Sequence, residues 1–149
     1  MMRAFALGLI VLLSCAAGTG SSAAPNASPV GRWVTEGGWS QVEIYPCGAN
    51  LCGRLVWLKE PREKNGEIKV DTKNPDPARR AQTMVGLTIM WNFANTSEPS
   101  EWEGGRIYNP LDGGTYRAMM RLRPDGKLEV RGYVVLPLFG GSQHWERVR

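Results

Sequence analysis

The stretch 31–54, GRWVTEGGWSQVEIYPCGANLCGR, constrains the fold of this chain more than any other segment. Polar and apolar side chains alternate from Gln41 to Tyr45, which is the period-two pattern of a β-strand with one face in water. A turn follows, and the chain then enters a second β-rich run. The segment therefore predicts an antiparallel hairpin near the start of an all-β domain.

Two cysteines flank the turn of this hairpin. Four residues separate Cys47 from Cys52, and a facing pair at the mouth of a hairpin has a Cα separation that a disulfide accepts. Their spacing is wider than the C-x-x-C of a redox pair, and no helix N-terminus is predicted beside them to activate a thiolate. We predict a structural disulfide between Cys47 and Cys52.

The first 24 residues have the layout of a signal peptide. Arg3 supplies a positive charge, residues 4–13 are apolar, and small residues dominate 14–24. The apolar run of ten residues is shorter than the roughly 20 that a membrane-spanning helix needs. We therefore expect export to the periplasm, an oxidising compartment in which a disulfide persists.

The run LLSC at 12–15 leaves the processing of this leader open. If cleavage precedes Cys15, the mature protein is a membrane-anchored lipoprotein on a flexible tether. If cleavage follows Ala23 or Ala24, Cys15 is discarded, and a flexible segment, 25–30, precedes a soluble domain, 31–149. We favour the second route, because a leader ending before Cys15 is short for a signal peptide.

About 125 residues remain after the leader, which suffices for one domain with one core. The chain has 18 Lys and Arg against 14 Asp and Glu, and without Arg3 the excess is about +3. The basic residues are scattered along the sequence, whereas a nucleic-acid interface needs a clustered basic face. We expect no nucleic-acid partner.

Short β-rich runs separated by turn residues fill the rest of the chain. Asn65-Gly66 is a strong hairpin signal that leads into a run at 68–70. Asp76 is suited to cap a short helical turn near 77–82, which begins with Pro77. Further strands are expected at 53–59, 84–93, 102–108, 115–122, 128–135 and 142–148.

Eight or nine short strands in hairpin succession favour a closed barrel, because closure removes the exposed edges of the sheet. Alternation places Ala118 and Met120 on one face of their strand, and Arg117 and Arg121 on the other. The predicted fold is a single small antiparallel up-and-down β-barrel of about eight strands.

Seven motifs, in order, resemble those of the bacterial family known as domain of unknown function 2147. They span 31–148 and read Gly-x-Trp, WSQVEIYPCG, LCGRLVWL, DTKNPDPARR, GGRIYNPLDGGTY, LEVRGYV and LFGGSQHWERV. The resemblance implies an exported, lipocalin-like (calycin) barrel, in whose first strand Trp33 closes the barrel floor. It implies no established activity.

Residues typical of catalysis are sparse in this sequence. His144 is the single histidine and lies in a predicted strand beside Trp145, where a structural or surface role is usual. Neither a Gly-x-Ser-x-Gly elbow nor a His-Glu-x-x-His helix is present. We predict no catalytic residues, no metal and no cofactor.

The segment DTKNPDPARR is the best candidate for a polar site. Oxygens of Asp71, Asn74 and Asp76 would converge on a cation, and Arg79 would meet an anion, although the spacing is not that of an EF-hand. Alternatively, Asp76 caps the helical turn, Asn74 forms a turn, and an arginine pairs with Asp71 to fix the loop over one end of the barrel. We favour the second interpretation.

The six tryptophans are the other candidates for a functional role. They either fill the barrel or line a cavity for an apolar or amphipathic ligand, and the sequence leaves both possibilities open. In the second case Trp57 and Trp91 should face the interior, while Tyr108, Arg117 or Gln143 meets the polar end of the ligand near the rim.

The leading hypothesis is a non-enzymatic envelope protein that binds a small hydrophobic or amphipathic molecule in this barrel. The alternatives are an enzyme acting on a cell-envelope substrate, and a structural or interaction module. Ligand, partner proteins and oligomeric state do not follow from the residues.

Overall fold

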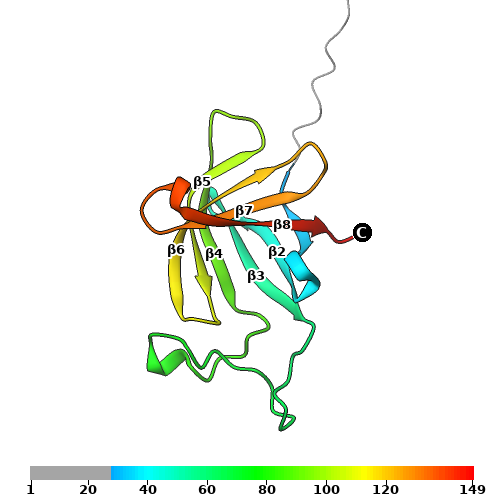
Figure 1. Ribbon diagram of the computed structural model, residues 1–149, viewed down its shortest axis with the longest axis vertical. Helices are drawn as coiled ribbons and strands as arrows, with labels where there is room; N and C mark the ends of the chain where they lie inside the picture. The colour runs from blue at the N-terminus through cyan, green and yellow to red at the C-terminus, as the bar shows by residue number, and fades with distance from the viewer. Residues whose placement is uncertain (1–27) are drawn as a thin grey trace, which may run out of the picture.

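The computed structural model describes residues 28–149, in which eight antiparallel strands close into a barrel (Figure 1). The strands are β1 (Gly31–Val34), β2 (Ser40–Cys47), β3 (Asn50–Leu58), β4 (Thr88–Asn95), β5 (Glu101–Asn109), β6 (Gly114–Leu122), β7 (Leu128–Tyr133) and β8 (Gly140–Arg147). Each strand pairs with the next along the chain, and β8 pairs with β1. The predicted up-and-down barrel is confirmed, while the predicted leader with Cys15 lies outside the described residues.

Between the strands of the described residues lie three short 3₁₀ turns: η1 (Glu36–Gly38), η2 (Pro77–Arg79) and η3 (Pro137–Phe139). The predicted helical turn is η2, and the Asp76 side chain caps it by accepting a hydrogen bond from the Ala78 N–H at 3.0 Å. Within 28–149 there is no helix with the length and apolar character that crossing a bilayer requires.

The β2–β3 hairpin carries the predicted disulfide between Cys47 and Cys52, whose Cα atoms are 5.8 Å apart. The two cysteines are diagonal neighbours and do not face each other, since Cys47 pairs with Asn50 and Cys52 with Tyr45. The bond therefore ties the two strands just before their tight turn.

Residues 59–87 form a long connection between β3 and β4, the β3–β4 excursion, which hangs below the barrel in Figure 1. The strand predicted at 68–70 is wrong, because the excursion contains only the isolated bridges Arg62–Ile68 and Val70–Thr83. Ile68 is 52% exposed, so this short run has no apolar face to bury against the barrel. β4 begins at Thr88, later than the expected residue 84, and Val85 before it is 40% exposed.

One end of the barrel, the closed end, is built around Trp33, which is fully buried. Its indole N–H donates to the Pro29 carbonyl at 2.7 Å, and the Arg147 guanidinium lies 4.2 Å from the ring centroid. Arg147 also donates to the carbonyls of Ser28 and Val30. The expectation that Trp33 closes the barrel floor is borne out by this burial.

Bulky side chains fill the interior next to the closed end. Phe93, Trp102 and Trp145 are all buried there. A Cβ atom built on Gly105 would lie 2.6 Å from the Phe93 ring, and one on Gly53 would lie 2.9 Å from the Met90 sulfur. These two glycines provide the space that the neighbouring large side chains occupy, so this half of the barrel is packed.

Candidate functional site

The opposite half of the interior differs, and we call it the barrel mouth. Register places five residues on its inner wall, because they pair with or alternate with buried interior positions: Ile107, Tyr116, Gly132, Gly141 and Gln143. None of the five is buried, in contrast to the ring of side chains beneath them. The inner wall is therefore reached by solvent at this end.

Two glycines pair across β7 and β8 in this wall. A Cβ on Gly132 would make only an ordinary 3.7 Å contact with Ile107, and one on Gly141 would have nothing within 4 Å. The wall there is backbone without side chains, and at Gly141 it borders open space. No turn or positive φ angle requires either glycine.

The seam between β8 and β1 is short. The two strands pair only at Trp33–Arg147 and Val34–Glu146, so the first part of β8 runs past the end of β1. Gln143 lies in that unpaired part, exposed although it points inward, and its amide oxygen accepts a 2.9 Å hydrogen bond from Trp145. Gln143 thus lies at the mouth.

Trp91 does not face the interior, and that expectation is wrong. Between the interior pairs Leu51–Phe93 and Gly53–Met90, β4 has one residue more than β3, so the simple alternation breaks. Trp91 instead pairs with Arg106 on the outer wall.

The same mechanism moves Trp57 outward. A bulge between Gln41 and Val42 pairs Val42 with Leu55 but pairs Gln41 with Trp57. Trp57 therefore leaves the face of its interior neighbour Leu55 and is 43% exposed at the end of β3. In both strands, a bulge that the alternating pattern does not reveal reverses the predicted face.

Tyr108 is also placed differently from the expectation. It is buried on the outer wall beneath the β3–β4 excursion, and its hydroxyl donates to Asp71 at 2.7 Å. Burial, with the adjacent Asp71 carboxylate, raises the pKa of Tyr108 to about 12. Tyr108 is consequently a structural donor and is not presented to the rim.

The DTKNPDPARR segment is held by internal bonds, as the second interpretation predicted. Asp71 is fully buried and also accepts from the Asn74 amide at 2.7 Å, while Arg80 donates to the Asn74 carbonyl. The prediction that an arginine pairs with Asp71 is wrong, because the Tyr108 hydroxyl is the partner of that carboxylate. Arg79 is a surface residue 3.7 Å from Asp76.

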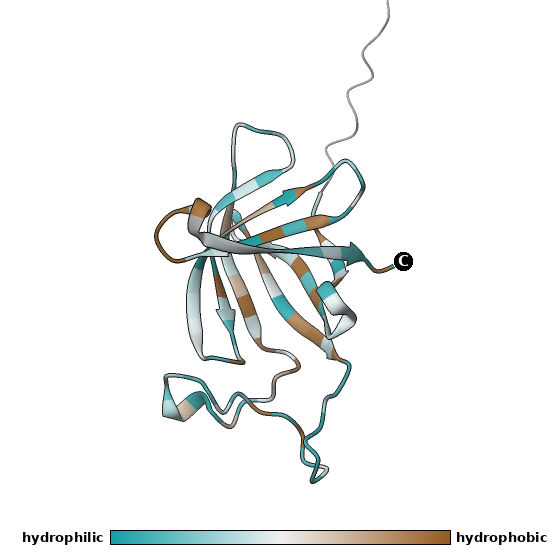
Figure 2. Ribbon diagram, in the orientation of Figure 1, coloured by the Kyte–Doolittle hydropathy of each residue, from teal (hydrophilic) through white to brown (hydrophobic). Residues whose placement is uncertain are grey.

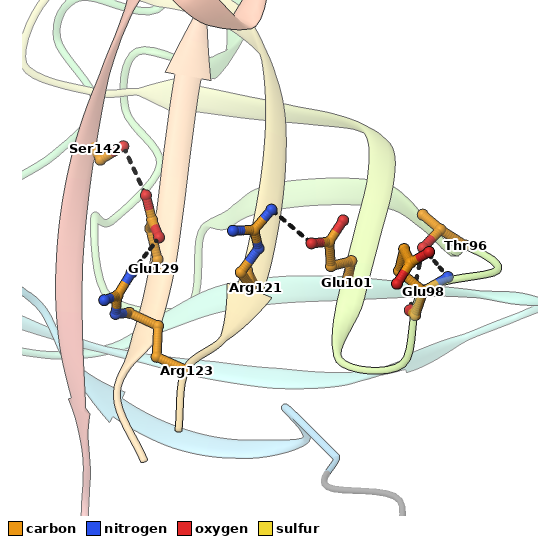
Figure 3. A network of polar contacts seen from close by, with 7 residues as sticks. All are labelled: Thr96, Glu98, Glu101, Arg121, Arg123, Glu129 and Ser142. Atoms are coloured by element: carbon orange, nitrogen blue, oxygen red, sulfur yellow. Dashed lines mark hydrogen bonds and ion pairs between the residues drawn. The ribbon is translucent and has the colours of Figure 1, made fainter. Parts of the chain in front are cut away.

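A polar network lies on the outer walls of β5 to β8 (Figure 3). Glu129 accepts from Arg123 at 3.0 Å and from Ser142 at 3.2 Å, and nearby Arg121 pairs with Glu101 at 2.6 Å. Burial by itself would raise the pKa of Glu129, but the bonds from Arg123 and Ser142 outweigh it and hold the pKa below its usual value.

His144 pairs with Glu129 across β7 and β8 and is exposed on this outer wall. Arg117, the remaining candidate for a ligand's polar end, is also on the outer wall, as alternation predicted.

In the part of the chain that the structure describes, no group of three or more His, Cys, Asp or Glu side chains is arranged to hold a metal.

Two surface hollows are lined by residues other than those of the mouth. One, of about 250 Å³, is on the outer wall of β6 and β7 beside Arg121 and Glu129. The other, of about 560 Å³, is an open depression between the β3–β4 excursion and the start of β4.

Several connections at the mouth end of the barrel carry exposed apolar side chains. Trp39 is 60% exposed after η1, and Leu111 is 78% exposed in the β5–β6 turn. The β7–β8 loop, residues 134–138, is coloured brown in Figure 2 and projects from the barrel. The sequence pattern predicts a strand in the first part of this loop and a turn in the rest, although VVLPL is a continuous apolar run.

The closed eight-stranded barrel with one packed end and one open end defines a protein of lipocalin-like architecture. The chain belongs to the family described as "Uncharacterized protein conserved in bacteria (DUF2147)", whose model matches residues 31–147. This confirms the family resemblance seen in the motifs.

One solved structure supports the same fold. Protein HP1028 from the human pathogen Helicobacter pylori, described as belonging to the lipocalin family, is 22% identical and aligns with a TM-score of 0.69 over 80% of this chain and 82% of that one. No curated protein matches the chain.

Proposed function

We propose that this protein binds a small hydrophobic or amphipathic molecule in the barrel mouth. The observation that carries the proposal is the contrast between the two ends: the interior is packed around Trp33, while Gly132 and Gly141 leave the wall at the mouth bare. Eight-stranded barrels have room for one small ligand, and apolar concave sites with few polar groups are usual ligand sites.

The side chains of the mouth indicate the chemical character of the ligand. Ile107 and the ring of Tyr116 offer apolar contact, whereas the amide of Gln143 and the hydroxyl of Tyr116 offer hydrogen bonds. An apolar body with one polar end fits this combination, for example a fatty acid, an isoprenoid or a fragment of a phospholipid.

The proposal includes export to the cell envelope. It is supported by the signal-like residues 1–24 and by the Cys47–Cys52 bond, because disulfides persist in oxidising compartments. Intact mass analysis of the mature protein distinguishes the two routes: cleavage after Ala23 or Ala24 gives an unmodified chain, whereas cleavage before Cys15 gives a lipid-modified one.

The test of binding is a thermal-shift screen of these three ligand classes against the wild type, Gly141→Ala and Gly141→Trp. A ligand at a hundredfold excess over its dissociation constant stabilises the folded state by about 2.7 kcal/mol. We expect the shift in the wild type and in Gly141→Ala, where only a methyl group is added, and its loss in Gly141→Trp, where the indole occupies the mouth.

Unliganded melting temperatures show whether each variant folds, and Gly132→Leu is the second blocking variant should Gly141→Trp unfold. Native mass spectrometry of gently purified protein provides an independent search for a retained ligand. The proposal fails if no compound shifts the wild type, or if the blocked mouth binds as well as the open one. A structural or interaction module is then the better description.

A further inference from the structure

Four residues form a row across the outer wall of the barrel, on β4 to β7. Cross-strand register pairs Trp91 with Arg106, Arg106 with Arg117, and Arg117 with Tyr133. Directly paired residues share a face of the sheet and lie close together. The row therefore places two arginines side by side between two aromatic rings.

The arginine pair is unusual in its surroundings. Like charges directly opposite each other destabilise a sheet. Most arginines on these walls have partners, such as Arg121 with Glu101 at 2.6 Å. Among residues 28–149, neither Arg106 nor Arg117 makes an ion pair or a side-chain hydrogen bond. Two free guanidinium groups in one place are suited to an anion, above all a phosphate.

The exposed β7–β8 loop begins at the end of this row, directly after Tyr133. Its apolar side chains are open to solvent, with exposed fractions of 68% for Val134, 65% for Val135, 54% for Leu136 and 79% for Leu138. Contiguous exposed apolar groups on a folded protein usually mark a contact surface.

Arg131 fixes the backbone of this loop. Its guanidinium donates to the carbonyls of Pro137, Leu138 and Gly140 and also to the Ser142 hydroxyl. Arg131 thus holds the loop backbone at Pro137 and Leu138, while the apolar side chains of the loop remain exposed. Arg131 also adds a third positive charge at the base of the loop.

We propose that the 134–138 loop and the Arg106–Arg117 pair form a docking surface for an anionic phospholipid bilayer. Apolar side chains enter the boundary between headgroups and acyl chains, while neighbouring arginines meet lipid phosphates. Trp91 and Tyr133 flank the arginines, and such aromatic rings are favoured at the membrane interface. The arginine pair lies on the outer wall and the loop lies at the mouth end of the barrel. Docking of a bilayer there does not require a ligand in the barrel mouth.

The experiment is co-sedimentation with vesicles of phosphatidylcholine, with and without phosphatidylglycerol. The full chain carries Cys15→Ser in every variant, so that lipidation cannot anchor it. Each arginine at an anionic surface strengthens binding about fivefold. Arg106→Gln/Arg117→Gln should therefore weaken binding to the anionic vesicles on the order of 25-fold. Leu136→Ser/Leu138→Ser should weaken binding to the same vesicles.

The matched control is Lys64→Gln/Arg149→Gln, which removes the same charge from exposed positions elsewhere. It should change binding far less, and neutral vesicles should retain little protein. Melting temperatures confirm that the variants are folded, and inorganic phosphate serves as a soluble competitor.

The proposal is overturned if the anionic vesicles do not bind the wild type, or if the control weakens binding as much as the arginine pair. It is also overturned if the leucine variant binds normally while phosphate competes fully, since the pair would then be a site for a soluble anion.

Discussion

Arg147 lies over the ring of Trp33, with the guanidinium carbon 4.2 Å from the ring centroid. The last strand of the barrel therefore covers the first core residue of the first strand. Arg147 also donates to the carbonyls of Ser28 and Val30, so one side chain ties both chain ends of the barrel to its floor. A guanidinium over an indole face is attractive as well as space-filling.

Trp33→Ala should destabilise the protein by about 3–5 kcal/mol, the range for deleting a large buried aromatic side chain. Urea denaturation measures the loss. Trp39→Ala is the control, because Trp39 is 60% exposed and its removal should change stability by only about 0.5 kcal/mol. A small loss for Trp33→Ala would contradict its role in the floor.

Tyr108→Phe should cost about 1–3 kcal/mol, because it leaves one oxygen of the buried Asp71 carboxylate without its donor. The β3–β4 excursion should also become more sensitive to proteolysis. Tyr116→Phe is a matched control, since it removes a tyrosine–aspartate bond of 2.9 Å to Asp112 at the surface. We expect a smaller loss there, and equal losses would argue against Asp71 as the anchor of the excursion.

Glu129 should contribute to the fall of the free energy of unfolding at acidic pH. Its pKa is lowered in the folded state by Arg123 and Ser142, in spite of burial, from an ordinary value of 4.5. The stabilisation is therefore present above about pH 4.5 and is lost as the pH falls through the lower folded value. Urea midpoints across this range should fall less steeply in Glu129→Gln than in the wild type, and parallel curves would contradict the assignment.

Cys47→Ser/Cys52→Ser should lose roughly 2 kcal/mol and still fold, because the bond closes only a small loop. Peptide mapping under non-reducing conditions should find the two cysteines linked in the mature protein. Free thiols at both positions in that material would be evidence against a structural disulfide.

Local sequence patterns predicted much of the fold. Alternation from Gln41 to Tyr45 and along β6 follows directly from the two-residue repeat of a strand, and turn residues marked where strands end. The disulfide and the Asp76 cap depend on residues close in sequence. For these features the interacting groups are neighbours along the chain, so the sequence alone determined them.

Tertiary structure decided the rest. Bulges turned Trp57 and Trp91 outward, because the register with a neighbouring strand, and not the strand's own sequence, sets where an extra residue falls. The partner of Asp71 is the hydroxyl of Tyr108, 37 positions away, and not an arginine. The bare wall at Gly132 and Gly141 arises in the same way, since pairing between strands brings single, unremarkable residues together only once the barrel has closed.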